Sequence, residues 1–527
     1  MPDPRFPLHE EPCVPVQWTT QALITHPELP ASLTLPDVLT RSHEIAALAV
    51  PDPPAYAALL RILYPLTARV TSLDEAGPGD WARRRLRILD DGALPQPHIE
   101  DYFARWGHRF RLFDPEGGRP WMQDPRLAHQ CDPARSAGVN KLSMTRSSGN
   151  NHAWWTHTRD QAPDPLPATR AWLDMLTWHY YGAAGRGSAR EVGGASSSTM
   201  KAGPLRTALS YHPEGSTLFE TLLAGLVKPE AVVRRETDLC PWEWDELPDP
   251  DADPRPVTGP CSRLTAVSQH AVLLLPDPHD SSQVTDAFIT WAYRTGRIPR
   301  TDPYLIWQVS QQGNIYPRPA DASRGLWRDL DALLLAEAGG PAQPRRPPVF
   351  TTALEFGDAL GMPLAVRALG FDQEGQAKDR QFVTSLTPPV LAHAETDDAG
   401  TAPATGRLRS LGEMYGRRLD RAVRRAHSLY SDNKKAKEAA SWAERAAAVY
   451  WPRAQDEFWA RFRELDRSGA LLLEAGLDRA AARTAFLRLA EEAYATVTAP
   501  ISHTPRGAKA VTQARIELYG GHRRPTR

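Results

Sequence analysis

Apolar positions along the first 400 residues follow two different periods. Residues 55–73 are apolar at roughly helical spacing, which predicts a core helix with a kink or break at Pro65, and a further helix is expected at residues 166–181. The short continuous apolar runs 271–275 and 288–293 are typical of buried strands. The pattern therefore predicts a body in which helices and strands are mixed.

The last quarter of the chain follows the helical period alone. A polar run at residues 395–406, rich in threonine, alanine and glycine, is the best linker in the chain. Beyond it, helices are expected near residues 408–430, 435–467, 478–497 and 507–519. The sequence therefore predicts an α+β protein, with a mixed α/β N-terminal domain, residues 1–404, followed by a C-terminal four-helix bundle, residues 405–527.

A polar segment at residues 370–382 carries the strongest candidate chemistry. Phe371 and Phe382 can anchor its two ends, and Gly375 supplies the positive φ of a tight turn, so a presented hairpin is expected. The polar side chains at its tip are Gln373, Gln376 and Lys378. Amides that both donate and accept hydrogen bonds, placed beside a cation, suit the edge of a nucleic-acid base better than a small-molecule pocket. A solvated surface hairpin is the alternative.

Two further segments have the composition of contact loops. Residues 147–158 are polar, small and aromatic without a regular period, and their candidate contact residues are Gly149, Asn150, Asn151 and His157. Glycines are concentrated at residues 182–187 and again at Gly193 and Gly194. Small residues let a backbone approach a ligand and expose its N–H groups to phosphates, although a flexible turn explains them equally. Neither a P-loop nor a Rossmann pattern is present.

Charge is distributed unevenly between the two predicted domains. The net charge of the chain is −1, but residues 405–527 hold 24 Lys and Arg against 14 Asp and Glu, which leaves 38 against 49 in residues 1–404. Such asymmetry hints that one part binds a polyanion. Candidates for contacts with a phosphate backbone are Arg294, Arg297 and Arg300, and in the bundle Arg417, Arg421, Arg424 and Arg425, whose spacing places them on one helix face. A solvated face is the commoner explanation of such runs.

Several classes of function find no support in the sequence. The four cysteines are far apart, so neither a zinc site nor a disulfide framework is indicated, and no metal or other cofactor is expected. No apolar run is long enough to span a bilayer and the N-terminus lacks an export pattern, so we expect a cytoplasmic protein. We find no convincing nucleophile, metal or phosphate-transfer motif, and we expect no enzyme activity. Two alternatives stay open: an enzyme acting on nucleic acid with His152, His157 and Asp160 as an acid–base cluster, and a helical scaffold whose basic bundle binds RNA.

Several weak motifs nevertheless occur in the order of one known family. They are Pro15-Val16-Gln17-Trp18, Pro120-Trp121-Met122-Gln123, Ser148-Gly149-Asn150-Asn151 with His157-Thr158, the glycines at 182–187 and at Gly193-Gly194, Pro241-Trp242-Glu243, and the Gly370-Phe371 hairpin followed by a helical C-terminus. Over nearly its full length the chain resembles the large subunit of the type I-E CRISPR Cascade complex, the CasA family. No single motif is specific, and their common order carries the resemblance.

The resemblance implies a non-catalytic subunit at one end of a crRNA-guided complex. Its partners would be the other Cascade subunits with crRNA, target double-stranded DNA, and the helicase-nuclease that it helps to recruit. It would recognise the protospacer-adjacent motif and open the duplex for R-loop formation, with Gln376 as the best match to the family's wedge and Gln373 as the runner-up. A glycine loop with Gly182, Gly185, Arg186 and Gly187 would contact the motif from the minor groove, the long loop would contact the crRNA-bearing part, and Arg294 through Arg300 stand where the family's basic finger carries a lysine.

Overall fold

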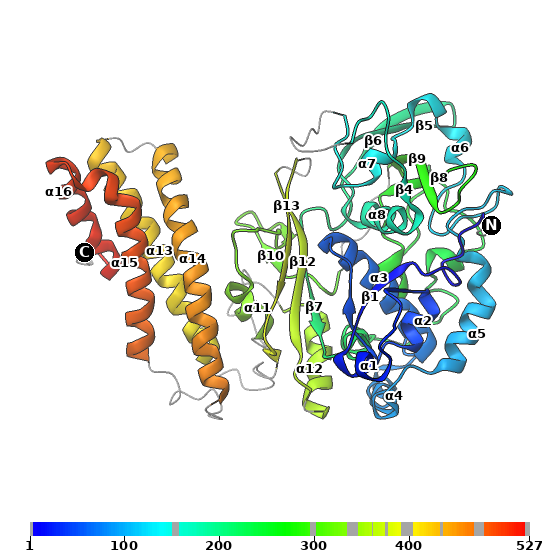
Figure 1. Ribbon diagram of the computed structural model, residues 1–527, viewed down its shortest axis with the longest axis horizontal. Coiled ribbons are helices and arrows are strands. Elements are labelled where there is room, and N and C mark those ends of the chain that lie inside the picture. The colour runs from blue at the N-terminus through cyan, green and yellow to red at the C-terminus, as the bar shows by residue number, and fades with distance from the viewer. Residues whose placement is uncertain are drawn as a thin grey trace. The chain divides into compact units, whose positions relative to one another are not determined.

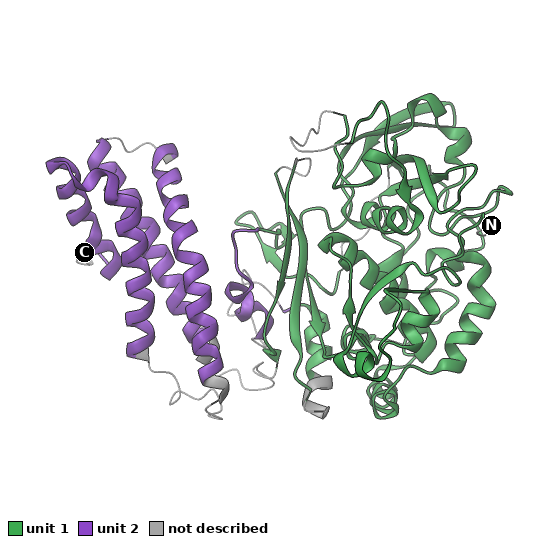
Figure 2. Ribbon diagram, viewed as in Figure 1, with its two compact units in different colours: residues 1–321, 347–392 green, residues 322–346, 393–527 purple. Residues whose placement is uncertain are grey.

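The computed structural model describes residues 4–149, 158–295, 302–334, 346–360, 362–374, 378–391, 404–432, 436–467 and 479–521. The chain forms two compact units, coloured separately in Figure 2. Unit 1 comprises Met1–Asp321 and Pro347–Ala392, and unit 2 comprises Ala322–Arg346 and His393–Arg527. Unit 1 mixes helices with small sheets, whereas the described elements of unit 2 are helical, so the predicted α+β class is confirmed.

Two buried helices form the core of unit 1 (Figure 1). Helix α3 (Pro53–Thr71) begins at two prolines whose fixed φ suits the first helical turn, and it ends where Ser72 adopts a φ of 54°. Every residue of α3 is buried, and the helix continues through Pro65, where the sequence predicts a kink or break. Helix α8 (Ala168–Tyr181), almost as fully buried, packs against α3. Helices enclosed on all sides in this way belong in the centre of a fold.

The other described helices of unit 1 have at most 14 residues. They are α1 (Thr20–Thr25), α2 (Leu35–Thr40), α4 (Pro78–Asp91), α5 (Gln96–Trp106), α6 (Leu127–Gln130), α7 (Val139–Leu142), α9 (Leu218–Ala224), α10 (Pro260–Thr265) and α12 (Pro348–Leu360), with 3₁₀ turns η1 (Gly107–Arg109), η2 (Pro133–Arg135) and η3 (Pro241–Glu243). Between η1 and α6, Pro120 directly precedes the buried Trp121.

The described strands of unit 1 pair in five small antiparallel groups. Three groups have three strands each: β2–β1–β3 (Ser32–Leu33, Val14–Trp18, Ile45–Leu48), β13–β12–β7 (Lys378–Leu386, Ala365–Glu374, Leu209–Glu214) and β4–β9–β8 (Leu166–Pro167, Gln283–Trp291, His270–Pro276). The other two are the hairpins β5–β6 (Gly185–Val192, Ala195–Met200) and β10–β11 (Trp307–Val309, Ile315–Pro317). Short strands joined by tight turns explain why few long alternating runs are visible in the sequence.

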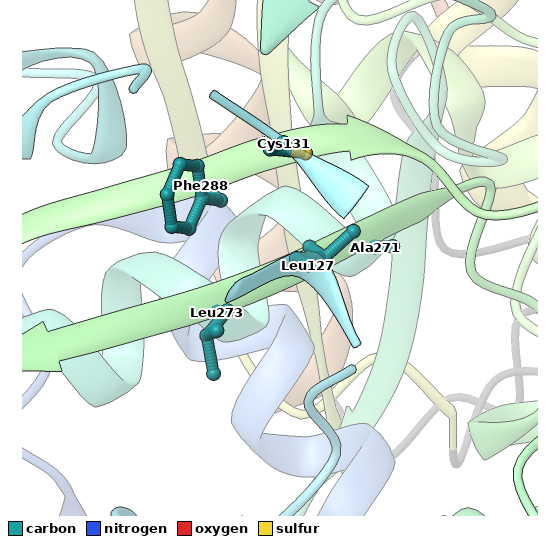
Figure 3. Close-up of a cluster of buried hydrophobic side chains, with 5 residues drawn as sticks. All are labelled: Leu127, Cys131, Ala271, Leu273 and Phe288. Carbon is teal, nitrogen blue, oxygen red and sulfur yellow. The ribbon is translucent and has the colours of Figure 1, made fainter. Parts of the chain in front are cut away.

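One apolar cluster shows how the predicted strands 271–275 and 288–293 are buried (Figure 3). Ala271 and Leu273 lie two residues apart on the same face of β8, and Leu273 pairs with Phe288 of β9. Leu127 of α6 and Cys131, which follows that helix, complete the cluster, and each of the five residues is at most 7% exposed. Burial raises the pKa of the Cys131 thiol to about 11, as expected for a packing residue.

Unit 2 contains the bundle that the sequence predicts. Its helices are α13 (Ala404–Ser431), α14 (Ala436–Arg467), α15 (Arg479–Ser502) and α16 (Pro505–Ala514), which continues into the 3₁₀ turn η6 (Arg515–Tyr519). Helix α14 continues through Pro452. The bounds differ by a few residues from the prediction, because the ends of amphipathic helices carry little periodicity.

The unit boundary differs from the predicted single division at residue 404. The turn η4 (Leu326–Asp329) and helix α11 (Leu330–Leu334) belong to unit 2. Trp327 is fully buried there, with its ring 5.0 Å from that of Phe458. It lies against Gly412, on which a Cβ atom would stand 2.7 Å from the indole. Glycine at this position therefore makes room for a side chain that arrives from far away in the sequence.

Candidate nucleic-acid interface

The hairpin predicted at residues 370–382 is formed by β12 and β13. Phe371 and Phe382 lie directly opposite each other, with ring centres 5.0 Å apart. Such a cross-strand aromatic pair stabilises the hairpin and fixes its register. A bulge between Asp372 and Gln373 then shifts the pairing, so that Gln373 faces Asp379 near the tip.

The polar residues of the tip are in different situations. The half-buried Gln373 donates a hydrogen bond from Nε2 to Asp379 Oδ1, 3.4 Å away, so its amide has a partner within the hairpin. Lys378 opens β13 opposite Glu374. Gly375 and Gln376 lie outside the described residues, as does the Lys378 side chain, so the choice of Gln376 as the wedge remains a prediction.

The glycine-rich segment at residues 182–187 is not the loop that the sequence predicts. It enters strand β5 at Gly185. Gly187 packs tightly on strand β9, because a Cβ atom there would clash with the Ile289 carbonyl oxygen, and a Cβ on Gly182 would stand 2.5 Å from the His270 ring. These two glycines therefore permit close packing within unit 1, which the spacing of glycines alone cannot distinguish from an approach to a ligand.

Exposed glycine backbone is found at the two ends of the β5–β6 hairpin. Gly185 has a φ of +138°, and a Cβ built on it meets no described atom within 4 Å. The turn between β5 and β6 consists of Gly193 and Gly194, whose φ angles of +59° and +76° are those of a tight two-residue hairpin turn. Arg186 beside Gly185 is also exposed. The backbone that a ligand can approach is therefore that of Gly185 and Arg186 at the open end of the hairpin, and that of the Gly193–Gly194 turn at its other end.

Arg294, the first residue of the predicted basic segment 294–300, is hydrogen-bonded to the β5–β6 hairpin. It donates from Nε to Asp251 at 2.6 Å and from Nη2 to the Val192 carbonyl oxygen at 2.9 Å. Its guanidinium also lies 4.9 Å from the centre of the Trp291 ring. With these partners Arg294 has a structural role that the charge pattern does not indicate, while Arg297 and Arg300 lie outside the described residues.

Arg206 joins the glycine-rich segment to the hairpin β12–β13. Its Nη1 donates to the carbonyl oxygen of Tyr181, the last residue of α8, at 3.0 Å, and its Nη2 forms an ion pair with Asp379. The guanidinium lies 5.2 Å from the centre of the Phe371 ring and is 2% exposed. Burial lowers the pKa of Arg206 and raises that of Asp379, and the ion pair opposes both shifts. Sequence reasoning missed Arg206, because no motif or period marks the residues around it.

Asp160 follows the predicted contact loop, residues 147–158, and holds the start of that loop close to its end. Asp160 accepts hydrogen bonds from Asn140 Nδ2 at 3.2 Å and from the backbone N–H of Gly149 at 2.7 Å. Gly149 has a φ of +58°, so a glycine suits this turn. Both carboxylate oxygens of Asp160 therefore brace the loop, while Asn150, Asn151, His152 and His157 lie outside the described residues.

Three of the four arginines predicted to share a face of α13 have acidic partners in unit 2. Arg417 lies 3.7 Å from Glu413, Arg424 lies 2.9 Å from Asp420, and Arg425 pairs with Glu517. In the described residues Arg421 forms no ion pair. The three paired guanidiniums are at least 42% exposed, so these pairs contribute at most about 1 kcal/mol each and leave the side chains able to exchange partners.

Two kinds of feature are not found within the described ranges. No group of three or more His, Cys, Asp or Glu side chains there is placed to hold a metal ion. No helix among them is both long and apolar enough to cross a membrane.

Comparison with known proteins identifies the family. The model of the CRISPR-associated protein Cse1 family matches residues 8–493. The chain belongs to the Cse1 family. This agrees with the resemblance to the CasA large subunit inferred from the order of its motifs, because a curated relative from Thermus thermophilus is described as CRISPR-associated protein CasA/Cse1.

The relatives of this Cse1-family chain differ in how much they share with it. The Thermus thermophilus protein is 26% identical over 348 residues, which is 64% of this chain and 61% of the relative's length. A chain solved as part of a CRISPR RNA-guided surveillance complex is 37% identical, and the match covers 98% of this chain and 100% of the other with a TM-score of 0.83. The structure of Thermus thermophilus CasA (Cse1) matches with 21% identity and a TM-score of 0.73, covering 98% of this chain and 99% of the other, which shows a shared fold.

Proposed function

We propose that this protein is the large subunit of a crRNA-guided type I-E surveillance complex and detects target DNA for it. The observation that carries the proposal is the full-length similarity, at 37% identity, to a chain described as a CRISPR RNA-guided surveillance complex. Its partners are then the other Cascade subunits with crRNA, and the target double-stranded DNA. This assignment also accounts for the excess of basic residues after residue 404.

In such a complex the protein has a limited task. Pairing with the guide RNA recognises the sequence of the target, which leaves the protein to recognise a few base pairs beside it and to start strand separation. A minor-groove contact suits this task, because close backbone approach combined with an inserted side chain can bend and unstack a base step at a cost of about a few kcal/mol. The groove's degenerate pattern also tolerates several related motifs.

The candidate elements divide that task between them. We assign motif recognition to Gly185, Arg186 and the Gly193–Gly194 turn, whose backbone is exposed, and strand separation to Gln376 at the tip of the hairpin β12–β13. Arg206 supports this assignment, because it bonds both to the residue before the glycine-rich segment and to the hairpin. A wedge and a recognition surface that act on adjacent base pairs must be held in fixed relation to one another.

The same proposal gives the protein no chemical step of its own. Degradation of the target belongs to the helicase-nuclease that the complex recruits after R-loop formation. The use of both Asp160 oxygens as loop braces supports this view against an acid–base cluster with His152 and His157. Incubation of the purified protein with duplex DNA, single-stranded DNA and RNA in Mg²⁺ or Mn²⁺ should leave all three intact.

The decisive test of the assignment compares complexes with and without this chain. The other subunits and crRNA should bind single-stranded targets without it, but should form R-loops on duplexes in a motif-dependent manner only when it is present. R-loop formation on duplex DNA that is equally efficient without the chain, or equally efficient on a duplex with a scrambled motif, would overturn the assignment.

A further inference from the structure

Two lysines meet at the open end of the β5–β6 hairpin, where Gly185 exposes its backbone. Lys141, in the short helix α7, donates a hydrogen bond from Nζ to the carbonyl oxygen of Arg186. Lys201 follows Met200, the residue of β6 that pairs with Gly185. Helix α7 and the hairpin, which are separate in the chain but lie in the same part of unit 1 (Figure 1), therefore bring both lysines to one short piece of exposed backbone.

The ammonium group of Lys141 is not neutralised within the described part of unit 1. Its side chain is half-buried and forms no ion pair with a described residue. Burial lowers the pKa of Lys141 from its ordinary value of 10.5, whereas a neighbouring carboxylate would raise it. One of its three N–H donors serves the Arg186 carbonyl oxygen, which leaves two for another acceptor. An anion is the group that best stabilises a partly buried cation of this kind.

Lys201 is held in a similar way at the end of the other strand of the hairpin. Its side chain is exposed, and its Nζ donates to the carbonyl oxygen of Thr295 at 3.1 Å. A carbonyl partner orients an ammonium group without removing its charge. Arg186 is exposed as well, so this end of the hairpin carries three cationic side chains, those of Lys141, Arg186 and Lys201.

A phosphate diester is the anion that this arrangement fits best. Lysine presents a compact charge with rotatable donors and is a common phosphate ligand. The exposed backbone of Gly185 and Arg186 is assigned to motif recognition in the minor groove of the target duplex. That groove is only about 6 Å wide, and the phosphates of one strand border it on each side. Cations that flank a backbone segment in so narrow a groove therefore lie close to phosphates.

We propose that Lys141 and Lys201 form a phosphate-binding site, which holds the backbone of the target duplex while Gly185 faces the base pairs of the motif. This inference rests on the proposed function, to which it adds two residues from outside the glycine-rich segment. Phosphate contacts fix the position of a protein on a duplex but carry no sequence information. The two lysines therefore strengthen binding to every duplex and leave the choice of motif to the exposed backbone and Arg186.

The test measures equilibrium binding of duplex DNA by the assembled complex over a series of salt concentrations. In the double variant with Lys141→Gln and Lys201→Gln, the slope of log K against the logarithm of the salt concentration should fall by about 0.9 for each phosphate that is no longer neutralised. The ratio of affinities for a duplex with the motif and one with a scrambled motif should keep its wild-type value.

Two results would overturn the proposal. The first is a wild-type slope in the double variant. The second is a reduced motif ratio, because it would show that Lys141 supports the strand that carries Arg186 and does not bind a phosphate.

Two single variants show whether the charge itself is responsible. Lys141→Arg keeps the charge and should keep the wild-type slope. Lys201→Gln changes only an exposed side chain and should lower the slope by about half as much as the double variant. This single variant tests the proposal even where Lys141→Gln lowers the stability of unit 1, and a wild-type slope in it would refute a phosphate contact at Lys201.

A matched pair of arginines controls for overall charge. Arg83 and Arg87 are exposed on α4, which lies at the opposite end of unit 1 from the β5–β6 hairpin (Figure 1). Arg83→Gln with Arg87→Gln removes the same charge and should keep the wild-type slope, whereas a loss equal to that of the lysine variant would show a general effect of charge and refute the site. Failure of the proposed function is distinct, because it would appear in the wild-type complex as R-loop formation that does not depend on the motif.

Discussion

At the scale of single residues, two arginines hold the candidate DNA-contacting segments: the buried Arg206 and the half-buried Arg294. Arg206 and Arg294 each bond to two segments that are far apart in sequence, and neither belongs to a recognisable motif. A buried guanidinium must find acceptors for its donors, so each such residue imposes a fixed arrangement on the groups around it. The sequence marks arginines as candidate phosphate contacts, but it does not show which ones are already engaged inside the protein.

The first prediction concerns Arg206. Arg206→Met keeps the bulk of the side chain but removes the donors to Tyr181 and the partner of Asp379, so the free energy of unfolding of unit 1 should fall by about 1–3 kcal/mol. R-loop yield on duplex DNA should fall as well, because the hairpin loses its connection to the glycine-rich segment. Urea denaturation and an R-loop assay on the assembled complex measure the two effects.

The control for Arg206 lies on the same hairpin. Arg380 is more than half exposed and lies 3.4 Å from Glu374, so Arg380→Met should cost less than about 1 kcal/mol. If Arg380→Met reduces stability as much as Arg206→Met, the positioning role of Arg206 is wrong.

The second prediction concerns pH and rests on three buried histidines. Burial lowers the pKa of His179 and His270 to about 4 and that of His212 well below its ordinary value of 6.5. Between about pH 6.5 and pH 4 the unfolded chain binds more protons at these sites than the folded one, so stability is lost as pH falls through that range. Each histidine contributes up to about 1.4 kcal/mol per pH unit to the slope.

Denaturant unfolding of His212→Gln at several pH values measures this contribution. The variant should show a shallower loss of stability below pH 6.5 than the wild type, whatever its stability at pH 7.5. His108→Gln, at an exposed position, should keep the wild-type slope. An unchanged slope in His212→Gln would contradict the assignment of a neutral buried ring.

At the scale of helices and strands, prediction succeeded where the apolar periodicity is strong. It failed at glycines, because a glycine can be exposed to a ligand or can allow close packing inside the protein. The strand β8, the helices α3 and α8 and the bundle helices lie close to their predicted positions, because apolar periodicity records which face of an element is buried. Strand β9 begins at Gln283, five residues before the predicted run 288–293, because its first residues are less completely buried than its last. Gly185 and Gly187 look alike in the sequence, yet the first is open and the second is packed on β9. That difference depends on a strand about 100 residues away, and local composition does not contain it.

The third prediction concerns the arginine face of α13. Replacing Arg417, Arg421, Arg424 and Arg425 by alanine should lower the salt dependence of target binding by the assembled complex, with a change of about 0.9 in the slope of log K for each phosphate that is no longer neutralised. The pairs with Glu413, Asp420 and Glu517 do not prevent this, because the three arginine side chains are at least 42% exposed and can turn from a carboxylate to a phosphate.

A matched variant separates a direct phosphate interaction from a general effect of charge. Arg483, Arg488, Arg506 and Lys509 are exposed residues of α15 and α16, and their joint replacement by alanine removes the same charge from unit 2. This variant should keep the wild-type slope. If both variants lower the slope equally, the α13 face contributes only to the overall field of the protein.

At the scale of the whole molecule, the chain is divided in a way that no local pattern reveals. Residues 322–346 belong to unit 2, because Trp327 in this segment is buried against Gly412 of α13. The two residues are 85 positions apart, so their contact exists only in the folded chain and no local pattern marks it. The family, by contrast, was recognisable from sequence, because the order of many weak motifs survives where each motif alone is uninformative. The central proposal concerns function: we propose that the protein opens duplex DNA with one element and recognises it with another.

R-loop yield by the assembled complex, measured on a fully paired duplex and on the same duplex pre-opened beside the motif, tests that claim most directly. Gln376→Ala should lose yield on the paired target and recover most of it on the pre-opened one, because the cost of opening has already been met there. Arg186→Ala, on the exposed recognition surface, should lose yield on both targets. Equal losses for Gln376→Ala on the two targets would contradict the wedge, and recovery seen only with Gln373→Ala would keep the mechanism but move the wedge to Gln373.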